Sequence, residues 1–191
     1  MEYILASTNE HKAIELNELL AKAGMKIKAA EDKFEVIEDG ETFQENALIK
    51  AKAYYDKYGK ATVADDSGLV VPSMPEILGI YSARFAPECP DYIDKNLKLI
   101  ELLKDSSEEE RKAYFVCYLC FYNGPEEVFF FEGRVHGVIG TQIKGHDGFG
   151  YDPIFLPNGQ MGKSLAEVST WKMTNSHRAK ACAEAAIFFK Q

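Results

Sequence analysis

The chain has 191 residues, 46% of them hydrophobic and 12% aromatic, which is enough to bury a proper core as one domain over residues 1–191 or as two small lobes. Its 22 basic and 30 acidic residues give a net charge of −8, which argues against a general surface for nucleic acid or anionic membranes. No charged-then-apolar leader opens the sequence, and no apolar run approaches the ~18 residues of a membrane span, so we expect a soluble, cytoplasmic protein.

The N-terminal part of the chain predicts one strand and two helices. The stretch "EYILAS" is typical of a short buried strand, and residues 11–24 show the periodicity of a helix that ends at a glycine. A second helix is expected over 42–58, again stopped by a glycine. Thr42 and Glu45 form a Thr-x-x-Glu capping box, in which Glu45 returns a hydrogen bond to its own helix. A role for Glu45 in a metal site stays open.

The rest of the pattern predicts strands, helices and a glycine-rich loop. In chain order these are strands over 61–65 and 69–71 around an Asp-Asp-Ser-Gly turn, a helix over 91–105, strands over 112–122 and 126–139 joined by a hairpin, a glycine-rich loop over 145–153, and a closing helix over 176–190. Strands and helices that alternate in this way indicate a mixed α/β fold, in two lobes with a cleft.

Two of the four cysteines form the motif Cys117-x-x-Cys120. The motif lies in a β-branched and aromatic run that predicts a strand, where residues three apart face opposite sides. This geometry disfavours a shared metal or a disulfide, so we expect buried, reduced thiols.

Two predicted helices begin with cations, where the helix dipole disfavours them. Lys12 falls in the first turn after the polar segment "STNEHK", and His177 and Arg178 fall in the first turn of the closing helix. Amide donors and cations at a helix start are typical of sites for phosphate chains. We expect the two segments to bind parts of one polyanionic ligand; ordinary capping with cations exposed at the surface is the alternative.

Adjacent carboxylates at Asp65 and Asp66 interrupt the apolar run "VADDSGLVV". Neighbouring strand residues point to opposite faces, so only one of the two can face a given site. Glu38 lies in a glycine-containing loop before a helix and has no capping duty. Carboxylates such as Glu38 and Asp66 beside a phosphate chain suit Mg²⁺, which also takes water and phosphate oxygens. One acid would hold the metal or orient water for in-line attack on phosphorus.

Six segments carry a resemblance that spans essentially the whole chain: "STNEHK", "EDGETFQENALIKA", "VADDSGL", "GIYSARFA", "GFGYDPIF" and "NSHRAKA". In this order they resemble the Ham1-like inosine/xanthosine triphosphate pyrophosphatase family. The resemblance implies an elongated mixed β-sheet with flanking helices, in two lobes around a central cleft. It also implies a homodimer that uses Mg²⁺ to hydrolyse ITP, dITP and XTP to the monophosphate and pyrophosphate.

The resemblance further implies roles for single residues. Asp66 would be the catalytic base and, together with Glu38, would bind the metal. Substrate would be bound by the first loop, Lys50, Ser67 and a base pocket, that is, by Ser7, Thr8, Asn9, Glu10, His11, Lys12, Lys50, Ser67, Phe149, Gly150, Tyr151, Asp152, Lys172, His177 and Arg178. Arginine only donates hydrogen bonds, so Arg178 would donate to the 6-oxo group of hypoxanthine or xanthine and would disfavour the 6-amino group of adenine.

The chain departs from the family pattern in two places. Thr8 stands where the first loop usually has glycine, and residues 75–79 differ from the usual Gly-x-Pro-Gly loop before "IYSARFA", where Arg84 stays unassigned. Two other functions remain open, a pyrophosphatase for pyrimidine or modified nucleotides and a nucleotide-binding regulator without turnover. A partner nucleic acid is disfavoured by the net charge, and we expect no membrane partner.

Overall fold

The computed structural model of the protein describes residues 1–8, 10–32 and 34–190. The chain divides into two compact units, as the predicted two lobes require. Unit 1 consists of Met1–Ser67, Cys117–Gly133 and Arg178–Gln191, and unit 2 of Gly68–Val116 and Arg134–His177. Among the described helices, none is long and apolar enough to cross a membrane.

Six strands form one sheet in the order β2-β1-β3-β4-β5-β6. Strand β1 pairs in parallel with both β2 and β3, whereas β5 and β6 are antiparallel. The sheet is therefore mixed, as predicted. The strands are β1 (Glu2–Leu5), β2 (Lys26–Ala29), β3 (Thr62–Val70), β4 (Lys112–Gly124), β5 (Glu127–Ile139) and β6 (Phe155–Pro157).

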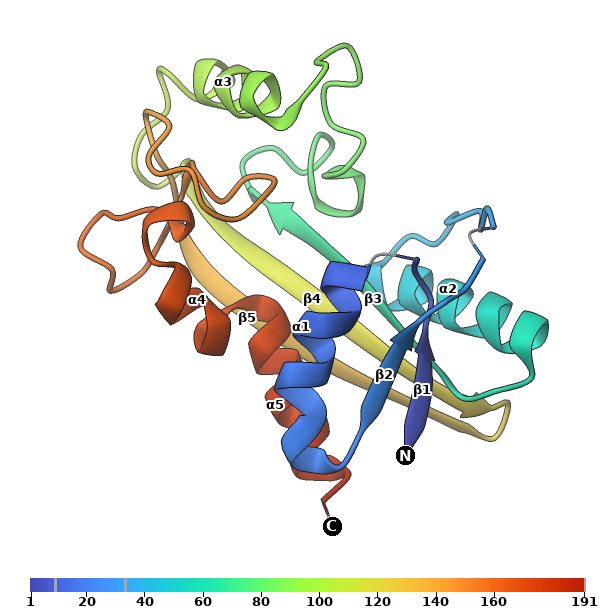
Figure 1. Ribbon diagram of the computed structural model, residues 1–191. Helices are drawn as coiled ribbons and strands as arrows, with labels where there is room; N and C mark the ends of the chain where they lie inside the picture. The colour runs from blue at the N-terminus through green and yellow to red at the C-terminus, as the bar shows by residue number, and fades with distance from the viewer. Residues whose placement is uncertain (9, 33, 191) are drawn as a thin grey trace. The chain divides into compact units, whose positions relative to one another are not determined.

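Helices flank this sheet, in agreement with the expected fold class (Figure 1). The predicted helices all form, with boundaries shifted by a few residues. The helices are α1 (Glu10–Leu20), α2 (Phe43–Tyr58), α3 (Tyr92–Leu102), α4 (Ser169–Asn175) and α5 (His177–Phe188), with 3₁₀ turns at Ala21–Ala23, Gly79–Tyr81 and Leu165–Glu167. Strands β2 and β6 and helix α4 were not predicted, because each is too short to show a clear period.

In unit 1 the two faces of the sheet are covered by different helices. Val63 and Cys117 pack in one buried core with residues of α1 and α5. Ala64 and Cys120 belong to the same strands but face the other way, and they pack in a second buried core with residues of α2. The two thiols of the Cys-x-x-Cys motif are free and lie on opposite faces of β4, as predicted.

The predicted turn at Asp-Asp-Ser-Gly is wrong, because β3 continues as one strand from Thr62 to Val70. Strand geometry sends Asp65 to the face of Val63 and Asp66 to the face of Ala64. Each carboxylate meets a cation from the helices on its own face, as described below. These ion pairs satisfy the two acids within the strand, so a turn that would expose them to solvent is unnecessary.

The N-terminus of α2 carries the capping box predicted from the sequence. Thr42 Oγ1 accepts a hydrogen bond from Glu45 N at 3.1 Å, and Glu45 Oε2 accepts one from Thr42 N at 3.0 Å. Glu45 Oε2 also accepts from Glu41 N at 2.8 Å. Glu45 is thus a capping residue of α2 in this structure.

We predict that Thr42→Ala lowers the free energy of unfolding by about 1 kcal/mol, because it leaves an amide at the start of α2 without its side-chain acceptor. Urea denaturation followed by circular dichroism measures the change. Glu41→Ala is the matched control, because only the backbone of Glu41 takes part in the cap. Equal stability of the two variants would show that the box contributes nothing.

Candidate active site

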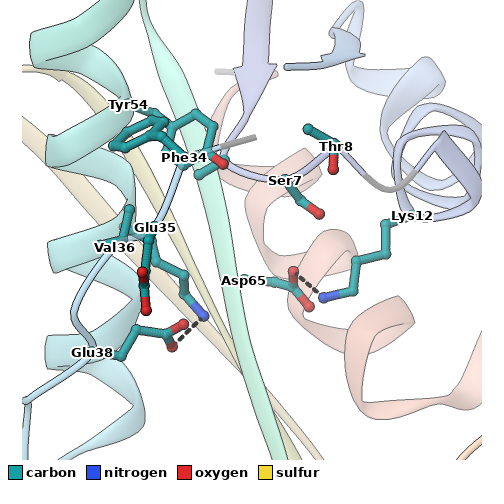
Figure 2. Close-up of a pocket in the computed structure, with 11 residues that line it drawn as sticks. Ser7, Thr8, Lys12, Phe34, Glu35, Val36, Glu38, Tyr54 and Asp65 are labelled. Atoms are coloured by element: carbon teal, nitrogen blue, oxygen red, sulfur yellow. Dashed lines mark hydrogen bonds and ion pairs between the residues drawn. The ribbon is translucent and has the colours of Figure 1, made fainter. Parts of the chain in front are cut away.

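A pocket of about 460 Å³ opens in unit 1 between the end of β1, the start of α1, the loop before α2, and α2 itself. Figure 2 shows Ser7, Thr8 and Lys12 on one side and the 34–38 loop on the other, with Asp65 between them. The pocket is lined by Ala6, Ser7, Thr8, Lys12, Phe34, Glu35, Val36, Glu38, Lys50, Tyr54 and Asp65. It is therefore bordered by two lysines and three carboxylates.

Asp65 lies between the two sides of the pocket and bonds to two cations. Its Oδ1 accepts from Lys12 Nζ at 2.9 Å, and its Oδ2 accepts from Arg178 Nη2 at 2.9 Å. Ser67 Oγ donates to the same Oδ2 at 3.4 Å. Arg178 continues to Glu15 on α1, with Nη1 and Oε2 3.1 Å apart. The pairing of adjacent strand residues led us to expect that Asp66 faces the cleft and that Asp65 points away from it toward a donor. Asp65 does have charged donors, but it is also the acid of the two that lines this pocket, so that part of the expectation is wrong.

Asp66 lies on the opposite face of β3, against α2. Lys50 Nζ sits 2.8 Å from Asp66 Oδ1 and 2.9 Å from Glu38 Oε2. One ammonium thus bridges the two carboxylates that the family resemblance assigns to the metal. The two oxygens converge on a single cation-sized position beside the pocket.

The two aspartates have opposite ionisation behaviour. Burial raises the pKa of Asp65, but Lys12 and Arg178 outweigh it and hold that pKa well below its ordinary value. Burial also raises the pKa of Asp66, and here Lys50 does not compensate, because Glu38 and Asp65 add further negative charge. Burial lowers the pKa of Lys50, but the surrounding carboxylates outweigh burial and raise that pKa above its ordinary value. Asp65 is a fixed anion, whereas Asp66 has the environment of a proton acceptor.

The predicted phosphate loop is partly described. Ser7 and Thr8 line the pocket with Lys12, which confirms that these three lie together. Asn9 lies outside the described residues, and so do the side chains of Glu10 and His11, which form the start of α1.

A second cluster of predicted residues gathers in unit 2. Asp152 Oδ2 accepts from Phe149 N at 2.9 Å and from Lys172 Nζ at 2.5 Å. The ammonium of Lys172 lies 4.7 Å from the centre of the Phe149 ring, and that ring is 62% exposed. A side chain at Gly148 would place Cβ 2.2 Å from Asp152 Oδ2, so only glycine fits there. The cluster offers a flat ring, a cation and a carboxylate beside one another.

Other residues assigned to the base pocket have different surroundings. Tyr151 is buried in the core of unit 2, where its hydroxyl donates to Ser82 O at 2.7 Å. Gly150 O accepts from Asn96 Nδ2 at 3.0 Å. His177 stacks on the Phe115 ring with centroids 4.9 Å apart.

Arg178 belongs to unit 1 and is engaged with Asp65 and Glu15. The structure therefore brings Phe149, Asp152 and Lys172 together and places Arg178 in an ion-pair network of its own unit.

The sequence analysis did not predict that Phe34 and Tyr54 line the pocket or that Glu15 pairs with Arg178. Phe34 and Tyr54 form an aromatic wall, with ring centroids 4.5 Å apart. Phe34 comes from a stretch whose composition indicates only a polar loop, and Tyr54 comes from α2. The alternation of Phe34 and Val36 among acidic residues was the available signal. Glu15 lies one helical turn after Lys12, a spacing that places both on neighbouring positions of α1.

Within residues 1–8, 10–32 and 34–190, no three His, Cys, Asp or Glu side chains gather into a metal site. Glu38 and Asp66 supply two carboxylates, which is the number that Mg²⁺ commonly takes from a protein when phosphate and water fill its other positions. The donor set fits a metal that arrives with a phosphate ligand.

Comparison with known proteins places the chain in a known family. Residues 3–188 match the model described as the Ham1 family. The "dITP/XTP pyrophosphatase" of Aquifex aeolicus (strain VF5) is 41% identical over 191 residues, covering 95% of this chain and 93% of the relative. The protein of the same name from Acholeplasma laidlawii (strain PG-8A) is 38% identical over 184 residues, covering 95% and 90%.

Solved structures agree with the fold. The Staphylococcus aureus Ham1 protein superposes with a TM-score of 0.87 at 32% identity, covering 100% of this chain and 98% of that one. The nucleoside-triphosphatase / dITP/XTP pyrophosphatase of Mycobacterium abscessus gives 0.79 at 36% identity, with 97% and 98% covered. The six segments, the mixed sheet and these matches over nearly the full length agree, and the chain belongs to the Ham1 family.

Proposed function

We propose that the protein hydrolyses the deaminated purine nucleoside triphosphates ITP, dITP and XTP to the monophosphate and pyrophosphate. The observation that carries this proposal is the unit 1 pocket, where Lys12, Lys50, Glu38 and Asp65 gather beside Asp66. Lysines and carboxylates around one pocket suit a phosphate chain with its metal. The names of the relatives support the same substrates.

Mg²⁺ is the metal that this donor set favours. Glu38 and Asp66 would hold it, because their oxygens already converge on the Lys50 ammonium within 2.9 Å. When bound, the ion supplies positive charge that stabilises the phosphate chain during cleavage. Lys12 and Lys50 contribute charge from the protein itself.

Asp66 is the group best suited to accept a proton from the attacking water. In the metal-free protein burial raises its pKa, and its ion-pair partner Lys50 lines the pocket. Water attacks phosphorus, its proton passes to the Asp66 carboxylate, and the anhydride bond to pyrophosphate breaks. Asp65, bonded through both oxygens to cations, has no comparable capacity.

The base is proposed to stack on Phe149 and to meet Asp152 and Lys172. Phe149 presents an exposed ring, and the Asp152 carboxylate accepts hydrogen bonds, which suits a ring N–H of hypoxanthine or xanthine. Lys172 donates and favours an oxo group. A 6-amino purine would leave such donors unmatched, at a cost of about 1 to 3 kcal/mol each.

A homodimer and a cytoplasmic location complete the proposal, both on the strength of the family resemblance and composition. A single nucleotide-hydrolysing domain over residues 1–191 also stays a prediction. Light scattering at several concentrations measures the oligomeric state.

The expected activity is release of pyrophosphate from ITP, dITP and XTP at rates at least about 100-fold above those for ATP, because several mismatched hydrogen bonds multiply. A coupled pyrophosphate assay with ITP, dITP, XTP, GTP, ATP and pyrimidine triphosphates, with and without Mg²⁺, measures it. Preference for a pyrimidine substrate would support the alternative pyrophosphatase. Nucleotide binding without any turnover would support the regulator.

The metal site is tested without substrate. We predict that Lys50→Gln binds Mn²⁺, a spectroscopic probe for Mg²⁺, about ten-fold more tightly, because the variant removes the cation that now bridges Glu38 and Asp66. Electron paramagnetic resonance titration reports free Mn²⁺. Lys52→Gln is the matched control on the exposed side of α2 and should leave the affinity unchanged. Weaker Mn²⁺ binding by Lys50→Gln would refute the assignment of the two carboxylates.

A further inference from the structure

Asp65, which precedes the proposed base Asp66, has a set of hydrogen-bond partners that Asp66 does not share. Each oxygen of Asp65 bonds to a different cation, Oδ1 to Lys12 and Oδ2 to Arg178, both at 2.9 Å. The side chains of Asp65 and Arg178 are 3% and 4% exposed, whereas Lys12 is 32% exposed. One cation of the pair is therefore buried and the other reaches the pocket.

The buried side of this network is anchored twice. Arg178 Nη2 bonds to Asp65, and its Nη1 lies 3.1 Å from Glu15 Oε2 on α1. A guanidinium offers its donors in a rigid fork, so two acceptors in fixed places define its orientation. Arg178 in turn fixes the Asp65 carboxylate, which leaves Oδ1 directed at Lys12.

Lys12 lies on the exposed side of the network, where its flexible side chain has to be held in one place to bind phosphate. A lysine side chain has four rotatable bonds, and holding its ammonium in one place costs rotamer entropy of up to about 2 kcal/mol. A partner that holds the ammonium before substrate arrives removes part of that cost from binding. Asp65 is such a partner, because its carboxylate holds the Lys12 ammonium beside the pocket, as Figure 2 shows.

We propose that Asp65 is a positioning residue that holds Lys12 Nζ at the pocket wall for the phosphate chain of the substrate. The inference rests on the proposed function, in which Lys12 binds that chain. Asp65 acts only through Lys12, and Arg178 with Glu15 keeps Asp65 in place. A charge at residue 65 is thus required for binding of phosphate, whereas the proton transfer belongs to Asp66.

A simpler role for Asp65, neutralisation of Lys12, predicts a change in polyphosphate affinity in the opposite direction. If Asp65 only neutralised Lys12, removing its charge would free the ammonium and tighten the binding of polyphosphate. If Asp65 positions Lys12, its loss leaves Lys12 and Arg178 as two cations with no shared anion, and the half-exposed lysine moves toward solvent. The binding of polyphosphate then weakens. The direction of the change separates the two roles.

The test is a double-mutant cycle on full-length protein with inorganic tripolyphosphate as the probe. Asp65→Asn should raise the tripolyphosphate Kd by about ten-fold, the scale of one lost charge-assisted contact. In a Lys12→Gln background the same change should have no further effect, because the lysine that Asp65 positions is already gone. The KM for ITP should follow the Kd, with a smaller fall in kcat.

Glu18→Gln is the matched control, since it also removes a carboxylate from α1 but at an exposed position outside the Asp65 network. We expect its tripolyphosphate Kd to stay within about two-fold of the parent, because a solvent-exposed charge contributes little. Additive effects of Asp65→Asn and Lys12→Gln, or tighter binding by Asp65→Asn, would overturn the inference. A parent protein that releases no pyrophosphate from ITP would instead overturn the proposed function.

A second measurement needs no change at residue 65 and covers the case in which Asp65→Asn does not fold. Carbon-13 relaxation of the lysine ε-methylene groups in the parent protein reports side-chain order on the ps–ns timescale. Before any nucleotide is added, Lys12 should be more ordered than Lys52, which is exposed on α2. Equal mobility of the two lysines would refute the positioning role.

Discussion

The ion-pair network around Asp65 is the constraint on which the arrangement of unit 1 depends. One buried carboxylate from β3 joins Lys12 of α1 and Arg178 of α5, and Arg178 returns to α1 through Glu15. A buried charge without partners would be costly, so β3, α1 and α5 must keep their places for the network to stay satisfied. The same contacts set the position of a lysine in the pocket. Structural and functional requirements therefore meet at one side chain.

The alternation of a β-strand explains how adjacent acids acquire different chemistry. Asp65 faces α1 and α5, where cations lower its pKa, and Asp66 faces α2, where burial and Glu38 raise its pKa. One peptide unit thus separates a fixed anion from a candidate base and metal ligand. Three helices supply the cationic partners, α1 and α5 for Asp65 and α2 for Asp66, and the strand only has to present both faces. No turn or special backbone conformation is needed at this position.

Much of the fold could be predicted from local sequence patterns. The prediction that failed depends on an interaction between residues that are distant in sequence. The helix after Thr42 was predicted because its cap is encoded within a few residues. The strand at 62–70 was divided by an incorrect turn, because Asp-Asp-Ser-Gly favours a turn locally while the cation that overrides it, Arg178, lies 113 residues away. The predicted phosphate lysine Lys12 and the predicted metal carboxylate Glu38 line one pocket. No local pattern pairs Lys12 with Asp65 or places Phe34 in the wall. The roles of the site residues stay predictions.

The central claim is that the two aspartates differ in ionisation because they face different helices. A carbon-13 carboxyl NMR titration of the free protein, with Asp65→Asn and Asp66→Asn used for assignment, measures both directly. The account predicts that Asp65 stays ionised well below the ordinary aspartate pKa of ~3.9 and that Asp66 titrates above it. The stability that Asp65 contributes should then be complete above that ordinary value and be lost as the pH falls through its lowered pKa. Similar pKa values for the two groups, or the reverse order, would contradict the account.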